Sequence, residues 1–150
     1  MKFLIAIDGS PASDRALEQA IRLGKPCDAT LLLLNVTEPT NALAWPAMLP
    51  TGEPLPLQMV TPADLDASNR AIAQAQLEQS HEMCVAAAVK SEMLLEMGSP
   101  RSMICEIAER ESVDVLIVGS RGLGNVQRLV LGSVSDYVIH HAQCPVLVVR

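Results

Sequence analysis

Short aliphatic runs alternate with helix-forming segments along the whole chain, and this alternation limits the possible folds more than any other feature. The runs lie at residues 3–7, 30–36, 90–97, 113–118 and 145–149, and each predicts a strand. The third run is only partly aliphatic and alternates with polar residues, which favours a position near the edge of a sheet. The others predict strands that helices cover on both faces.

Three segments between these runs begin with a hydroxyl residue followed by proline. Ser10-Pro11, Thr61-Pro62 and Ser99-Pro100 each place a capping side chain before a proline at the first helical position. A fourth helix is expected after Gly132, where apolar residues again recur at helical spacing. Five strands alternating with four helices specify a doubly wound α/β fold, in which a mostly parallel sheet carries helices on both faces.

The chain has the length of one domain. Its 150 residues are enough to bury a substantial core, and no internal repeat is present, so we predict a single domain over residues 1–150. Residues 37–62 interrupt the alternation, since six of the ten prolines lie there. Proline removes a backbone donor and fixes φ. This segment is therefore expected to form a long irregular loop.

The charge of the chain argues against nucleic acid and membrane surfaces as partners. The formal net charge is −6, whereas nonspecific binding to either partner requires clustered Lys and Arg. No stretch approaches the roughly 18 apolar residues of a membrane-spanning helix, and the apolar start at residues 3–7 is too short for a signal peptide. We therefore expect the protein in the cytoplasm.

The four cysteines do not have the spacing of a zinc site. Cys27, Cys84, Cys105 and Cys144 are widely separated, without a CxxC pair or a histidine at ligand spacing. Disulfides are disfavoured in a chain without an export signal. We therefore expect buried free thiols.

A glycine-rich segment follows the fourth predicted strand and leads into the last helix. Ligands of open α/β sheets bind at the carboxyl ends of the strands, where the strand order reverses. Ser133 and Ser135 lie in the first turn of the last helix, whose free N–H groups and dipole favour an anion. Without a Cβ atom, the glycines of this segment let the backbone approach a ligand closely; they are Gly119, Gly122, Gly124 and Gly132. The segment predicts a phosphate site, with a purely structural turn as the alternative.

Three charged residues accompany the candidate loops. Asp8, after the first strand, either lies beside a ligand or only caps the first helical turn. Arg121 and Arg128 either add positive charge for phosphates or are solvated surface residues. The P-loop and dinucleotide fingerprints are both absent from these loops, since no Gly-Lys-Ser/Thr follows Gly119 and the stretch after Asp8 lacks the further glycines.

The glycine spacing resembles that of a known family. Gly119-x2-Gly122-x9-Gly132-Ser133 matches the G-x2-G-x9-G-[S/T] signature of the ATP-binding universal stress proteins. Residues 5–10, 34–36, 98–100 and 144–149 resemble further stretches of that family, so the resemblance covers nearly the whole chain. It implies a Rossmann-like sheet with the strand order 3-2-1-4-5, and ATP with Mg²⁺ as the ligand.

The resemblance also assigns residues to the parts of ATP. Adenine is expected between the loops after the first and second strands, and the aspartate near the ribose and phosphates, where it helps to organise the metal ion. The phosphates are expected at the glycines and at the start of the last helix. The implied nucleotide-binding residues are Ala6, Ile7, Asp8, Val36, Val118, Gly119, Arg121, Gly122, Gly132, Ser133, Val134 and Ser135.

The implied function is ATP binding in a regulatory, stress-related role. No catalytic set can be assembled near the glycines, so at most slow ATP hydrolysis is expected. A dimeric interaction module without nucleotide is the alternative, and the intact glycine spacing argues against it. Family members dimerise through the final strand, so Val146–Val149, an aliphatic run at a sheet edge, is expected to pair with a second copy of the chain.

Overall fold

The computed structural model of the protein describes residues 1–40, 61–122 and 131–150. The strands in these parts are β1 (Lys2–Ala6), β2 (Thr30–Thr37), β3 (Lys90–Met97), β4 (Val115–Gly119) and β5 (Val146–Val149). The helices are α1 (Pro11–Gly24), followed by a 3-10 turn (Lys25–Cys27), α2 (Pro62–Ala86), α3 (Pro100–Arg110) and α4 (Ser133–His141). The predicted loop at 37–62 is one residue shorter at each end, because β2 extends to Thr37 and α2 already includes Pro62. Residues 41–60 within it lie outside the described residues.

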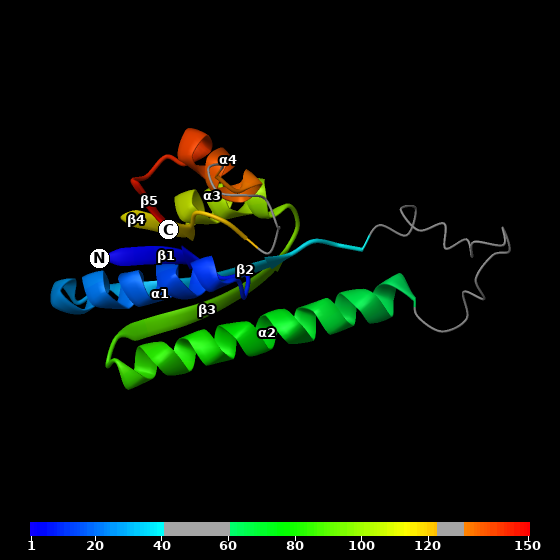
Figure 1. Cartoon of the computed structure of the whole chain (residues 1–150), viewed down its shortest axis with the longest axis horizontal. Coiled ribbons are helices and arrows are strands. Elements are labelled where there is room, and N and C mark those ends of the chain that lie inside the picture. The colour runs from blue at the N-terminus through cyan, green and yellow to red at the C-terminus, as the bar shows by residue number, and fades with distance from the viewer. Residues whose placement is uncertain (41–60, 123–130) are drawn as a thin grey trace, which may run out of the picture.

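The five strands form one parallel sheet in the order β3-β2-β1-β4-β5. β1 lies in the centre, where Ile5 is paired with Leu33 of β2 and Ile117 of β4. Helices α1 and α2 cover one face of the sheet, and α3 and α4 cover the other (Figure 1). The predicted doubly wound α/β fold, its strand order and the edge position of the third strand are confirmed.

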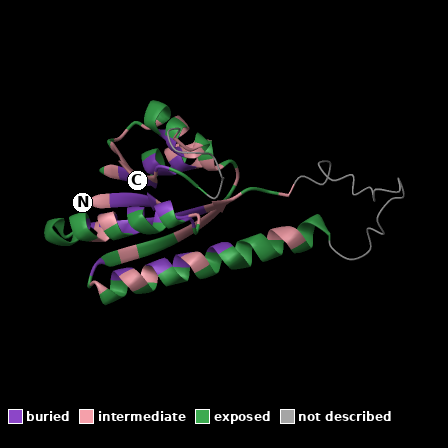
Figure 2. Cartoon of the chain, viewed as in Figure 1, coloured by how far each residue is buried: buried purple, intermediate pink, exposed green. Residues whose placement is uncertain are grey.

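The core consists of two aliphatic layers separated by the sheet. Successive side chains of a strand point to opposite faces, so Ile5 and Leu33 pack with α1 and α2, whereas Leu4 and Leu32 pack with α3 and α4. Figure 2 shows that burial is concentrated in the central strands β1, β2 and β4 and in the helix faces turned toward the sheet. The strand order changes direction between β1 and β4, so the carboxyl ends of these two strands are the expected place for a ligand.

The long helix α2 begins at the predicted Thr61 cap, which forms a capping box with Asp64. Thr61 Oγ1 accepts a hydrogen bond from Asp64 N at 3.1 Å, and Asp64 Oδ2 accepts one from Thr61 N at 2.9 Å. The hydrogen bond from the Thr61 hydroxyl to the Asp64 carboxylate lowers the pKa of that carboxyl. The first half of α2 is mostly exposed and projects beyond the sheet (Figures 1 and 2). Its second half packs on β2 and β3, so α2 reaches both the core and the ligand end of the sheet.

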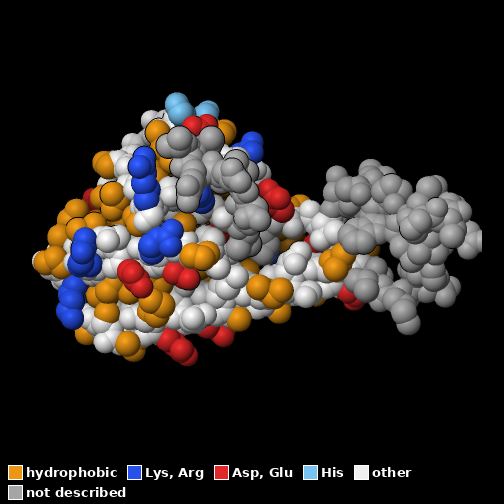
Figure 3. All heavy atoms as spheres, in the orientation of Figure 1, with side chains coloured by type: hydrophobic (Ala, Val, Ile, Leu, Met, Phe, Trp, Pro, Cys, Tyr) orange, Lys and Arg blue, Asp and Glu red, His pale blue; other side chains and the backbone are white. Residues whose placement is uncertain are grey.

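The surface carries both signs of charge. On the face seen in Figure 3, acidic and basic side chains are interspersed among hydrophobic ones over the body of the protein. None of the helices in the described part of the chain is both long and apolar enough to cross a membrane.

Candidate nucleotide site

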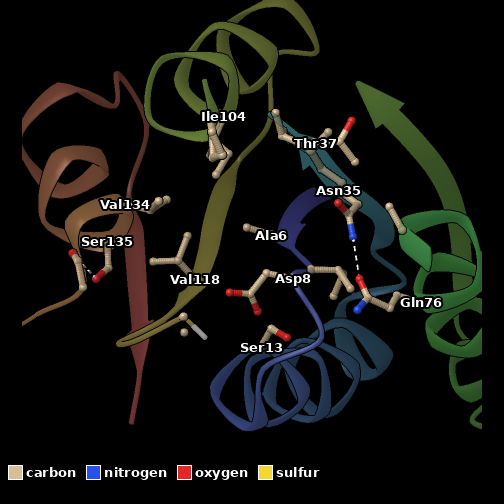
Figure 4. Close-up of a pocket in the computed structure, with 18 of the residues that line it drawn as sticks. Ala6, Asp8, Ser13, Asn35, Thr37, Gln76, Ile104, Val118, Val134 and Ser135 are labelled. Atoms are coloured by element: carbon tan, nitrogen blue, oxygen red, sulfur yellow. Dashed lines mark hydrogen bonds between the residues drawn. The ribbon is translucent and has the colours of Figure 1, made fainter. Parts of the chain in front are cut away.

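A cavity of about 750 Å³ opens at the carboxyl ends of β1, β2 and β4 (Figure 4). All twelve residues expected from the sequence to contact a nucleotide line this cavity. They come from the segments after β1 and β4, from the end of β2 and from the start of α4, which are far apart in the sequence. The fold therefore brings the predicted residues together at one place.

The segment after β1 holds Asp8 at the cavity wall. Asp8 Oδ1 accepts a hydrogen bond from Ser10 N at 2.9 Å, and Ser10 Oγ in turn caps α1 by accepting from Ser13 N at 3.2 Å. Asp8 thus fixes the turn into α1 and also faces the cavity (Figure 4). The two alternatives that the sequence left open for Asp8, a turn-capping residue and a ligand-facing residue, are compatible.

Ser120 holds together the two ends of the glycine-rich segment. Its carbonyl oxygen accepts hydrogen bonds from Gly132 N at 2.8 Å and from Ser135 Oγ at 3.1 Å, and its N–H donates to Val149 O of β5. Gly132 is the N-cap of α4, and no side chain of the described residues caps this helix. The first-turn N–H groups at Ser133 and Val134 have no partner within the helix. They are therefore available to an anion in the cavity, which both residues line.

Two glycines of this segment lie close to other groups. A Cβ atom on Gly119 would lie 2.7 Å from the carbonyl carbon of Ala12, so this glycine allows β4 to pack against the start of α1. A Cβ atom on Gly122 would lie 2.8 Å from Asp8 Oδ2, although Gly122 itself is exposed. Gly119 thus serves the fold and the cavity wall together, whereas Gly122 keeps the space beside Asp8 open.

The two ends of the cavity differ in chemistry. One end is formed by Asp8, the glycines and the first turn of α4. The opposite end is formed by the last residues of β2 and by one face of α2. Between them lie the apolar side chains of Val118 and Ile104 (Figure 4). An elongated ligand with an anionic end, an apolar flat part and a hydrogen-bonding edge would match this arrangement.

The contribution of α2 was not expected from the sequence. Asn69, Ile72, Ala73 and Gln76 line the cavity from this helix. Nothing in the helical pattern of α2 distinguishes these positions from solvent-facing ones, because the wall depends on how α2 crosses β2. Asn35, a polar residue within the aliphatic run of β2, was the one available signal in that strand.

The structure describes only one of the three remaining candidates from the glycine-rich segment. Arg121 is exposed at the rim of the cavity, and Gly124 and Arg128 lie outside the described residues.

All four thiols are free, but only Cys84 is fully buried and Cys27 is exposed, so the expectation of buried thiols was wrong for Cys27. Cys27 ends the surface turn after α1, which exposes it. Burial raises the pKa of the Cys84 thiol.

Comparison with known proteins identifies the family. The profile of the universal stress protein family matches residues 1–150. The chain belongs to the universal stress protein family. A curated relative from Staphylococcus haemolyticus, named as a universal stress protein, is 32% identical over 149 residues, which span 98% of this chain and 82% of the relative. A relative from Staphylococcus aureus strain USA300 is 33% identical with the same coverage.

Solved structures share the fold of this universal stress protein. The hypothetical protein MJ0577 matches with a TM-score of 0.80 and 26% identity, covering 99% of this chain and 94% of that chain. A universal stress protein family member from Arabidopsis thaliana, solved with AMP bound, matches with a TM-score of 0.69 and 27% identity over 99% of this chain and 90% of that one. A universal stress protein from Archaeoglobus fulgidus, at 18% identity, matches in fold with a TM-score of 0.74 over 100% and 98% of the two chains.

Proposed function

We propose that this universal stress protein binds ATP in the cavity and acts as a regulatory, stress-response protein. The observation that carries the proposal is the first turn of α4, which Gly132 caps without a side chain and which lines the same cavity as Asp8. Backbone N–H groups at a helix start bind phosphate oxygens through hydrogen bonds and the helix dipole. The phosphates are therefore assigned to the α4 end and the adenine to the β2 end.

The size and walls of the cavity support a nucleotide. Its volume of about 750 Å³ falls within the range of small-molecule and cofactor sites. Val118 and Ile104 provide an apolar surface for the ribose and base, and the AMP bound by the related Arabidopsis thaliana protein supports a nucleotide as the ligand class. With a net charge of −6, the chain attracts an anion only locally, through the helix start and Arg121.

Mg²⁺ is assigned to the phosphates, with Asp8 as the protein group beside it. In the described parts of the chain no three His, Cys, Asp or Glu residues are grouped to hold a metal ion. Mg²⁺ bound with a nucleotide usually takes one or two carboxylates together with phosphate oxygens and water, and Asp8 fits that role. When bound, the ion would offset the repulsion between the Asp8 carboxylate and the phosphates.

Fast ATP hydrolysis is not part of the proposal. Asp8 and Glu38 are the only carboxylates among the described residues that line the cavity, and Asp8 already accepts a hydrogen bond from Ser10 N. A rapid ATPase or kinase needs a group that positions or deprotonates the nucleophile. We therefore assign at most slow ATP hydrolysis to this protein.

The proposal also places the protein in the cytoplasm.

The direct test is calorimetric titration of the purified protein with ATP in the presence of Mg²⁺, after any bound nucleotide has been removed and identified by chromatography. We expect saturable binding of one ATP per chain, and adenine nucleotide in the material released from the protein. Binding should weaken when Mg²⁺ is chelated, because the phosphates then face Asp8 without a cation. Failure of ATP to bind with Mg²⁺ present would favour the interaction module without nucleotide.

The proposed partner is a second copy of this chain, paired through β5. The two edges of the sheet differ: β5 is entirely aliphatic and half-buried, whereas β3 carries Lys90, Glu92 and Glu96. Charged residues protect an edge strand from pairing, and an aliphatic edge without them favours it. Light scattering at micromolar concentration should give the mass of a dimer. A monomer mass at that concentration would remove β5 as the interface.

A further inference from the structure

A buried amide interrupts the aliphatic run of β2. Asn35 follows Leu31 and Leu33 on the face turned toward α2, and only 5% of its surface is exposed. The other buried polar residues in the described part of the chain are serines, whereas Asn35 carries a carboxamide with two donors and an acceptor. A buried amide requires partners for these groups, so its position in a cavity wall calls for an explanation.

Gln76 of α2 determines how the Asn35 amide is turned. Asn35 Nδ2 donates a hydrogen bond to Gln76 Oε1 at 2.9 Å. Because the nitrogen and oxygen of a carboxamide point to opposite sides, this bond directs Asn35 Oδ1 away from Gln76, on the side of Ala6 (Figure 4). No hydrogen bond to Oδ1 is found from the described residues, and Asn35 lines the cavity, so this acceptor is left for a ligand at the cavity wall.

Gly9 makes room for the Gln76 side chain. A Cβ atom on Gly9 would overlap the Gln76 amide, and its φ of +74° lies in the region that favours glycine. The Gln76 amide therefore packs against backbone on one side and bonds Asn35 on the other. Asn35 and Gln76 both line the β2 end of the cavity, opposite the first turn of α4.

The geometry points to Asn35 as the residue that reads the edge of the nucleobase, with Gln76 as the positioning residue that keeps its acceptor turned toward the base. This inference rests on the proposed function, because phosphates bound at α4 leave the base at the β2 end. An acceptor at this place matches the exocyclic amino group of a 6-aminopurine, which donates hydrogen bonds. A 6-oxopurine presents an acceptor instead, so the two oxygens would repel.

The test compares ATP with inosine triphosphate, in which a 6-oxo group and a protonated N1 replace the 6-amino group and the unprotonated N1 of adenine. Dissociation constants for both nucleotides, with Mg²⁺, are measured by calorimetry on the wild-type protein. We expect ATP to bind at least about tenfold more tightly, which corresponds to about 1.4 kcal/mol. Sites that hydrogen-bond a substrate N–H group discriminate against analogues that lack it.

Three variants separate the roles of the two amides. Asn35→Leu, which removes the acceptor, should bring the two affinities within about twofold of each other. Gln76→Leu should lower the preference toward the same value by freeing the Asn35 amide to rotate. Gln76→Glu keeps an oxygen that accepts from Asn35 Nδ2, so it should retain the wild-type preference. Gln76 is only half-buried, so its two variants are expected to fold and still test the proposal if Asn35→Leu does not fold.

The outcomes distinguish this inference from the proposed function. Wild-type protein that binds ATP and inosine triphosphate equally, or variants Asn35→Leu and Gln76→Leu that keep the full preference, would overturn the base-reading role while ATP binding stands. Equal loss of preference in Gln76→Glu and Gln76→Leu would overturn the positioning role of Gln76. Wild-type protein that binds neither nucleotide would overturn the proposed function and this inference together.

Discussion

Replacing Gly122 with valine is expected to weaken ATP binding at least about a hundredfold while leaving the fold intact. A Cβ atom at this position would lie 2.8 Å from Asp8 Oδ2, and the branched side chain would fill the space beside Asp8 where the phosphates are proposed to bind. A hundredfold loss is about 2.7 kcal/mol, comparable to the loss of one or two hydrogen bonds to a charged group. Because Gly122 is exposed, the valine side chain does not enter the hydrophobic core, and the free energy of unfolding should stay close to that of the wild-type protein.

The measurement is calorimetric titration with ATP and Mg²⁺, together with thermal unfolding of each protein. Gln143→Val is the control, since it introduces the same valine side chain at an exposed position between α4 and β5 that does not line the cavity. The control should bind ATP like the wild-type protein. Equal affinity of Gly122→Val and the wild-type protein would show that the phosphates do not lie at this segment.

Replacing Gly119 with alanine is expected to lower the free energy of unfolding by about 2–3 kcal/mol, the upper part of the usual range for overpacking. The added Cβ atom would lie 2.7–2.9 Å from the carbonyl carbon, Cβ and carbonyl oxygen of Ala12. These are mostly backbone atoms at the start of α1, so relief requires a shift of the whole helix. Since α1 also positions Asp8 and Ser10, ATP affinity should fall as well.

Urea unfolding measures this effect, with Gly24→Ala as the control. Gly24 has a helical φ of −71°, and its nearest contact would be Leu31 Cδ2 at 3.1 Å, the end of a side chain that can move. The helix propensity of alanine offsets part of that contact, so this variant should stay within about 1 kcal/mol of the wild-type protein. Equal stability of the two variants would mean that β4 and α1 do not pack as closely as described.

Local signals were sufficient for the fold and for one end of the cavity. Thr61 with Asp64 and Ser10 with Ser13 form hydrogen bonds within the first turn of their helices, and a proline follows each cap, so each cap could be recognised in the sequence. The start of α4 has no such side-chain cap, and Gly132 followed by Ser133 marks it instead. These residues lie within a few positions of the strand or helix end that they serve, which is why the glycine spacing located the α4 end of the cavity.

The other end of the cavity depends on packing between distant segments. Gln76 reaches Asn35 across 41 positions of the chain, and only the crossing of α2 over β2 brings them together. The contact between Gly119 and Ala12 likewise depends on how closely α1 approaches β4. No periodicity or spacing in the sequence encodes these distances. The β2 wall of the cavity and the packing of Gly119 against Ala12 could therefore be found only in the structure.

The most direct test of the central claim is a titration of ¹⁵N-labelled protein with ATP and Mg²⁺, followed by backbone amide chemical shifts. Binding as proposed predicts shifts at the amides of Gly132, Ser133 and Val134 for the phosphates, and at Ile7 and Val36 for the base. The two groups should titrate together with one dissociation constant. Unchanged amides at both groups at a concentration of ATP that saturates calorimetric binding, or shifts confined to another surface, would contradict the assignment of this cavity as the ATP site.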